Sequence, residues 1–241
     1  MPQHGPPASA GSVCANLEFA PAAVMPARVS ESIVLRSYPL KEADLVVSFL
    51  TRDLGKLRGA ARGARRPKSR FGAGLERLSQ VRMFYFQREN RELVTLDTCE
   101  LVSSPLKLAS EYEVAVAMDF FAEASDQLLP PAEPSELHFR LLASVLDYLR
   151  DEDARGRKDA VWPAMLYFSL WAVRIAGLLP RLRVSSESQA IAEEMMHSPI
   201  GQLSPRSWRK ETAADLRRFL VRRMEEHIER NFVTVPLLES L

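Results

Sequence analysis

The chain has 241 residues, of which 46% are hydrophobic and 26% charged, a balance typical of a folded globular protein with room for one large domain or two ordinary ones. Its two cysteines, Cys14 and Cys99, are too few for a disulfide framework or a cysteine-ligated metal site, so we expect a reducing, cytoplasmic setting. The formal net charge of +1 conceals an uneven distribution, because residues 52–91 hold twelve Lys and Arg against three Asp and Glu, whereas residues 92–241 hold seventeen against twenty-four.

The first 24 residues are rich in Pro, Ala, Gly and Ser and lack the charged start and apolar core of a secretory signal. This composition predicts a disordered extension over residues 1–28, with Met25 as a natural alternative start and no function upstream of it. The composition changes again near Pro105, so we expect two domains to follow, at residues 29–104 and 105–241.

Residues 29–104 contain five short runs rich in β-branched and aromatic side chains, separated by turn-like breaks. The predicted strands are residues 31–37, 43–50, 56–64, 80–87 and 92–102. Five strands with a longer connection after the third are typical of an OB-fold barrel, whose second and third strands commonly bind nucleic acid. A small SH3-like barrel is the alternative on this pattern alone.

The strongest functional signal is the segment from Lys56 to Arg70, which holds seven basic residues in fifteen positions and no acidic residue. Side chains alternate along a strand, so Lys56, Arg58 and Arg62 are expected on one face of the third strand. A phosphate backbone suits such a cluster, because each neutralised phosphate releases counterions; a solvated charge run is the alternative. The predicted nucleic-acid contacts are Lys56, Arg58, Arg62, Arg65, Arg66, Lys68, Arg70, Arg82 and Arg88.

The fourth predicted strand carries the aromatic run at residues 84–86. Phe84 and Phe86 share a face with Arg82 and Arg88, which is a combination suited to stacking on bases, whereas Tyr85 lies on the opposite face. One of these two sets must line the barrel core. The pattern alone leaves open which set faces DNA.

From Pro105 the hydrophobic period changes from two to about 3.6, which predicts an all-α helical bundle. Residues 161–179 are almost wholly apolar, but Arg174 interrupts them and no second such segment exists, so we interpret them as a buried helix and not a membrane span. Residues 181–207 are expected to form a short helix flanked by loops. The last helix is predicted to run from Ser204 and Pro205 to about Arg230. Its second basic cluster is expected to be solvated and salt-bridged, and consists of Arg217, Arg218, Arg222 and Arg223.

The sequence contains no recognisable catalytic or cofactor-binding constellation. The histidines His138, His197 and His227 are far apart and lack the spacing of metal ligands. No phosphate-binding glycine loop and no serine nucleophile motif occur. We therefore expect neither enzymatic activity nor a metal or other cofactor.

Three segments resemble a known family: GKLRGAARGARRPKSRFGAGLERLSQVRMFYF at residues 55–86, ELVTLDTCELV at residues 92–102 and GLLPRL at residues 177–182. From about Val29 onward the chain resembles the RecO recombination-mediator proteins. The resemblance implies an N-terminal OB-fold, a C-terminal helical bundle and a non-enzymatic, nucleoid-associated role in homologous-recombination repair. Such proteins bind single- and double-stranded DNA, anneal complementary strands and act with RecR in placing RecA on DNA coated by single-stranded-DNA-binding protein.

The chain departs from many members of that family in one respect. These members carry a four-cysteine zinc module after the position equivalent to residues 180–182, whereas residues 181–207 contain no cysteine. The expected fold is therefore α+β, with a five-stranded OB-fold barrel, an all-α helical domain and no zinc module.

An RNA-binding or ribosome-associated adaptor that uses the same basic barrel is the alternative function.

Overall fold

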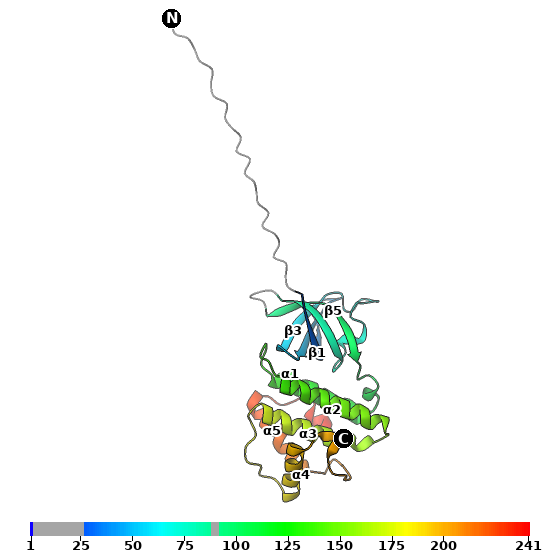
Figure 1. Cartoon of the computed structure of the whole chain (residues 1–241), viewed down its shortest axis with the longest axis vertical. Helices are drawn as coiled ribbons and strands as arrows, with labels where there is room; N and C mark the ends of the chain where they lie inside the picture. The colour runs from blue at the N-terminus through cyan, green and yellow to red at the C-terminus, as the bar shows by residue number, and fades with distance from the viewer. Residues whose placement is uncertain (2–26, 88–91) are drawn as a thin grey trace.

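The computed structural model describes residues 1, 27–87 and 92–241 of the chain. The predicted N-terminal extension, apart from Met1 and the last two residues, and the predicted contact Arg88 lie outside these residues. The described part has two layers, a β-barrel and a group of helices, and α1 (Tyr112–Leu128) is the helix that lies against the barrel (Figure 1).

The barrel is closed and has the strand order β1-β2-β3-β5-β4. Its strands are β1 (Ala27–Pro39), β2 (Leu45–Thr51), β3 (Gly55–Ala61), β4 (Gln80–Phe86) and β5 (Leu93–Ser103). β3 and β5 are parallel, and the other neighbouring strands are antiparallel. This is the five-stranded OB-fold predicted from the strand pattern, with only a short 3₁₀ helix (Gly72–Leu75) in the connection after β3.

Period-two burial builds the barrel core. Along β4, Val81, Met83 and Tyr85 are buried, and the Tyr85 ring meets the edge of Phe49 at a centroid distance of 6.0 Å. Gly59 on β3 also faces inward, where a Cβ atom would lie 2.6 Å from Cδ2 of Leu96. Close packing across the barrel therefore requires glycine at this position.

The helical part contains α1, α2 (Glu136–Ala154), α3 (Val161–Ile175), α4 (Ser186–His197), α5 (Ala214–Ile228) and α6 (Val235–Ser240). The apolar segment predicted as a buried helix forms α3, which packs against α1, α2 and α5. Gly177, with a φ of +70°, ends it, and the N–H of Leu178 donates to the carbonyl of Val173 at 2.9 Å. Among the described residues, no helix combines the length and apolarity needed to cross a membrane.

Two expectations for the C-terminal region are wrong. The last long helix, α5, begins at Ala214 and not at Ser204, because the N–H of Ser204 donates to the carboxylate of Glu194 at 2.5 Å and ties this segment to α4. Arg217 is not on a solvated face: it is 4% exposed, lies over the ring of Trp162 at 5.2 Å and pairs with Glu239. The exposed Arg222 and the partly buried Arg223 of α5 do form the expected salt bridges, both with Glu226.

Apolar side chains join the barrel to the helices. Ile33, Leu35, Leu50 and Leu78 are at most 1% exposed and belong to the same buried cluster as the cores of α1, α2 and α3. This shared core fixes the barrel on α1, so the helices cover part of the barrel's outer surface.

Candidate nucleic-acid interface

The loop that follows β3 carries most of the predicted contacts. We call residues 62–70 the basic loop. Its exposed cations are Arg62, Arg65, Arg66, Lys68 and Arg70. Arg62 lies in this loop and not in β3, because the strand ends at Ala61, three residues earlier than predicted.

Hydrogen bonds hold the backbone of the basic loop in turns. The N–H of Gly63 donates to the carboxylate of Asp44 at 2.8 Å, and Gly63 has a φ of +68°, a conformation that favours glycine. The N–H of Arg65 donates to the carbonyl of Ala43 at 3.0 Å. The loop is thus anchored to the β1–β2 connection, which fixes the backbone positions from which its basic side chains extend.

The cations of the basic loop differ in how far they are already paired. Within the described residues, no carboxylate forms an ion pair with Arg62, Arg65, Arg66 or Lys68. Arg70 pairs with Asp97 at 3.0 Å, with both side chains about half exposed. Exposed pairs contribute at most about 1 kcal/mol, so a phosphate can compete for this guanidinium.

Lys56 differs from the other predicted contacts because its side chain is largely buried against α1. Its side chain is only 13% exposed, its Nζ donates to the backbone carbonyl of Asp126 on α1, and it lies 3.9 Å from the carboxylate of Asp126. Burial lowers the pKa of Lys56, with the charge of Asp126 acting in the opposite direction. Lys56 is therefore a contact between barrel and helices, and its charge is matched before any DNA arrives.

The other predicted strand residues lie on the outer surface of the barrel. Arg58 on β3 is exposed and has no carboxylate partner among the described residues. Arg82 on β4 is exposed and pairs with Glu100 of β5 at 3.2 Å. Phe84 and Phe86 are half-buried on this outer face, since Tyr85 is the residue that fills the core. The structure thus places Phe84 and Phe86, and not Tyr85, on the side that a ligand can reach.

The helices cover part of the barrel surface that OB-folds commonly use. On β2, the outward-facing Ser48 and Leu50 are at most 1% exposed, and Oγ of Ser48 donates to the carboxylate of Asp126 at 2.5 Å. On β1, the exposed Arg36 remains next to this covered region, and its guanidinium lies over the ring of Tyr38 at 4.8 Å. Arg36 was not predicted, although its outward position follows from the pairing of β1 with β2.

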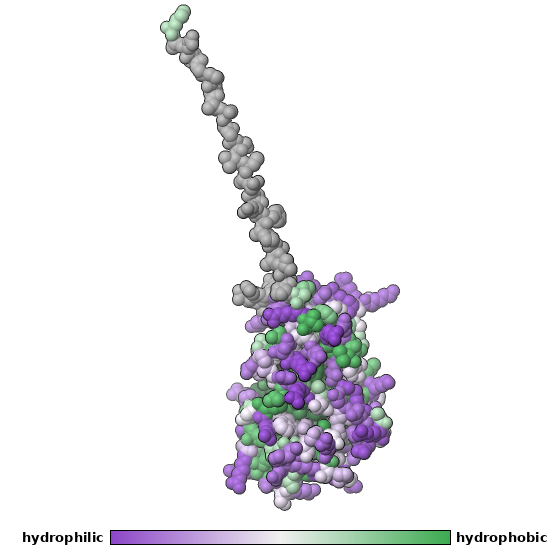
Figure 2. All heavy atoms as spheres, viewed as in Figure 1, coloured by the Kyte–Doolittle hydropathy of each residue, from purple (hydrophilic) through white to green (hydrophobic). Residues whose placement is uncertain are grey.

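Hydrophilic side chains cover much of the barrel and project from its edge on the face shown in Figure 2, with small apolar patches between them. The barrel surface on this face is therefore largely polar, and the large apolar side chains that the barrel strands expose are Val29, Leu93, Leu101 and Val102. This distribution suits a charged, hydrated partner better than a large apolar one.

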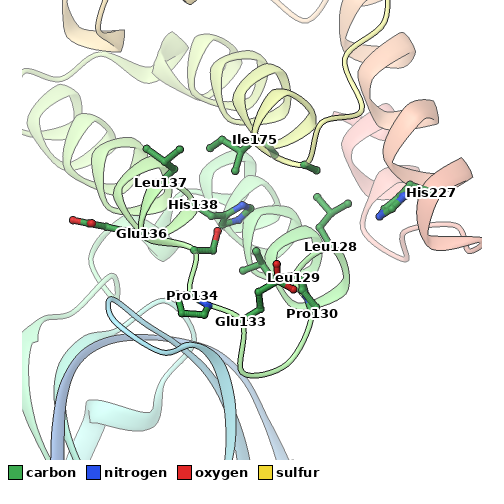
Figure 3. A pocket seen from close by; sticks show the side chains of 13 residues that line it. Leu128, Leu129, Pro130, Glu133, Pro134, Glu136, Leu137, His138, Ile175 and His227 are labelled. Atoms are coloured by element: carbon green, nitrogen blue, oxygen red, sulfur yellow. The ribbon is translucent and has the colours of Figure 1, made fainter.

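Among the described histidines, His138 is the buried one. His138 is 2% exposed, its Nε2 lies 2.9 Å from Oγ of Ser125, and burial lowers its pKa to about 4, which keeps the ring neutral. It borders a hollow of about 460 Å³ between the ends of four helices, and His227 lies on the far side of this hollow (Figure 3). Within the described ranges, no group of three or more His, Cys, Asp or Glu side chains could hold a metal ion.

Comparison with known proteins gives a consistent result. A family model described as Recombination protein O N terminal matches residues 25–105. The DNA repair protein RecO of Koribacter versatilis is 39% identical to this chain over an alignment that covers 88% of this chain and 98% of that protein. The DNA repair protein RecO of Cutibacterium acnes is 35% identical over 62% of this chain and 59% of its own length, and that of Bifidobacterium adolescentis is 34% identical over 66% and 63%. Because the Koribacter match runs through both the barrel and the helices, and not the basic segment alone, the chain belongs to the RecO family of DNA repair proteins.

Proposed function

We propose that this chain binds DNA through the basic loop and the outer surface of its barrel, and anneals complementary single strands. We further propose that it acts with RecR to help place RecA on DNA coated by single-stranded-DNA-binding protein. The observation that carries the proposal is the basic loop, whose backbone is held in turns while four of its cations have no carboxylate partner among the described residues.

Charge neutralisation accounts for annealing without any bond being made or broken. Two complementary strands repel each other through their phosphates, and a surface that binds phosphates releases counterions and lowers this repulsion. Arg62, Arg65 and Arg66 are suited to this task because none of them is ion-paired with a carboxylate of the described residues. We propose that this role is non-enzymatic, since neutralising phosphate charge requires no catalytic group.

A strand-annealing assay tests this function directly. We expect the full chain to accelerate annealing of two complementary DNA oligonucleotides, and to do so less as salt rises, because phosphate contacts weaken with ionic strength. Complementary RNA strands of the same sequence serve as the comparison. Acceleration of RNA annealing without any effect on DNA would contradict the proposal and favour an RNA-binding adaptor.

The helices offer a separate surface for the acidic tail of single-stranded-DNA-binding protein. A groove of about 240 Å³ lies between α2 and α3 and is lined by Leu137, Tyr167 and Trp171. Two exposed arginines flank these apolar side chains: Arg140 lines the groove, and the guanidinium of Arg174 lies over the Trp171 ring at 5.0 Å. We propose that apolar side chains of the tail enter the groove while its carboxylates meet the two arginines.

Reversing both charges should abolish this contact. We expect the double variant Arg140→Glu/Arg174→Glu to lose detectable binding to single-stranded-DNA-binding protein, measured by calorimetry, while keeping its affinity for bare DNA. Arg218→Glu/Arg222→Glu, which reverses two exposed charges on α5, is the matched control. Unchanged binding by the first variant, or equal loss in both, would show that the tail binds elsewhere.

A further inference from the structure

We infer that Arg36 of β1, Arg58 of β3 and Arg230, just after α5, form a composite site that holds a phosphate of a single DNA strand at the junction of barrel and helices. Two of these residues, Arg36 and Arg230, are absent from the contacts that the sequence predicts. The inference rests on the proposed DNA binding and extends the interface from the basic loop to the helical part of the chain.

The strand register brings the two barrel arginines to one row. Arg36 pairs with Ser48 across β1 and β2, and Ser48 pairs with Arg58 across β2 and β3. Paired residues point to the same side of a sheet, so Arg36 and Arg58 flank Ser48 on the outer surface. Since Ser48 is buried and its Oγ donates to Asp126, Arg36 and Arg58 occupy the row positions on either side of this contact between α1 and the barrel.

The third arginine comes from the other end of the chain. Next to Arg36 the surface is hollowed by about 460 Å³. The residues that line this hollow include Arg36 and Tyr38 from the barrel, Asp126 and Gln127 from α1, and His227 and Arg230 from the end of α5. Arg36 and Arg230 therefore share one opening, although nearly two hundred positions separate them in sequence.

The charges around the hollow favour an anion. Its one lining carboxylate, Asp126, is matched by Lys56 and by the hydroxyl of Ser48. None of the three arginines forms an ion pair with a described residue. Of the three arginines, Arg36 and Arg230 line the hollow, and Arg58 lies farther along the same row of the barrel. α1 and α5 both end here, and each helix end contributes about half a negative charge, so about one of the two lining positive charges stays unmatched. The neighbouring carboxylate of Glu229 does not line the hollow.

The neighbouring row of paired residues on the outer barrel surface favours a nucleic-acid strand over a small free anion as the ligand of the hollow. Tyr38 pairs with Val46, and Val46 pairs with Ala60, which continues the outer face from the hollow towards β3 and the basic loop. Arg36 is held in place by its position over the Tyr38 ring, which leaves its in-plane N–H groups free to meet phosphate oxygens. A strand bound at the basic loop can follow this row and place a phosphate among the three arginines.

The test is the salt dependence of binding to a labelled oligo(dT) single strand, measured by fluorescence anisotropy with the full chain. Arg36→Ala/Arg230→Ala should make the log–log slope shallower by about 0.7, since the composite site holds one phosphate and each phosphate that is no longer neutralised reduces the slope by about 0.7. The control Arg218→Ala/Arg222→Ala removes the same charge from exposed positions of α5 that do not line the hollow, and should leave the slope unchanged. Arg36→Gln/Arg230→Gln, which keeps polar side chains, is a second variant with the same expected slope.

Three outcomes separate the possibilities. If the wild-type chain does not bind the strand, the proposed function fails, and the composite site fails with it. If the wild-type chain binds and Arg36→Ala/Arg230→Ala has the same log–log salt slope as the wild type, only the composite site is overturned. If inorganic phosphate raises the melting temperature of wild type but not of this variant, while the DNA slope of the two is the same, the hollow binds free phosphate and the DNA assignment is wrong.

Discussion

Replacing Arg62, Arg65 and Arg66 together by Ala should make the log–log salt slope of single-stranded DNA binding shallower by about 2, from about 0.7 for each phosphate contact. These side chains project from the basic loop and have no ion-pair partner among the described residues, so their whole charge is available to a phosphate backbone. Binding should weaken similarly for strands of different sequence, because phosphate contacts carry no base information. Annealing should slow in parallel.

The fold should tolerate this triple substitution. The turns of the basic loop depend on Gly63, on the carboxylate of Asp44 and on backbone hydrogen bonds, none of which the substitutions remove. Exposed charged side chains also contribute little to stability. Arg209→Ala/Arg218→Ala/Arg222→Ala, which removes three exposed arginines from the helical part, is the matched control. A well-folded basic-loop variant with the slope of wild type would show that DNA is held elsewhere.

The sequence was sufficient to predict the barrel, because strand signals are local. Alternating burial, turn residues and aromatic content identified all five strands, and the boundary of β3 was wrong only where Gly63 adopts a positive φ and turns the chain early. Periodicity also placed Tyr85 on the opposite face of β4 from Phe84 and Phe86. It could not decide which side was the core, since both sides of β4 carry aromatic residues and only closure of the barrel selects one.

The parts of the site that could not be predicted all depend on contacts between distant segments. Lys56 reads as one more cation of a basic run, but it is covered by α1, seventy residues later in the chain. Arg36 and Arg230 are unremarkable in sequence and meet only because α5 ends beside β1. Arg217 reads as an exposed helix residue, but α6 and Trp162 cover it. Side-chain type and spacing carry no information on how the helices lie against the barrel.

Removing the carboxylate of Asp126 should destabilise the junction of barrel and helices by about 2–3 kcal/mol, since it leaves a largely buried lysine without its counter-charge and a buried hydroxyl without its acceptor. Asp126 is 16% exposed and Lys56 is 13% exposed, and Oγ of Ser48 donates to the same carboxylate. Asp126→Ala therefore should lower the free energy of unfolding, measured by chemical denaturation. Asp119→Ala is the matched control on the same helix: it breaks a pair with Arg77 that crosses the same junction but is almost half exposed, and it should cost less than about 1 kcal/mol.

A second substitution separates a buried-charge effect from a simple loss of packing. Adding Lys56→Met to Asp126→Ala removes the unmatched cation while keeping an unbranched side chain, so the double variant should recover much of the lost stability. A double variant less stable than Asp126→Ala would contradict a matched Lys56–Asp126 pair. Lys56→Met alone should also leave the salt slope of DNA binding unchanged, in contrast to the basic-loop variant, because the charge of Lys56 is matched by Asp126 before DNA binds.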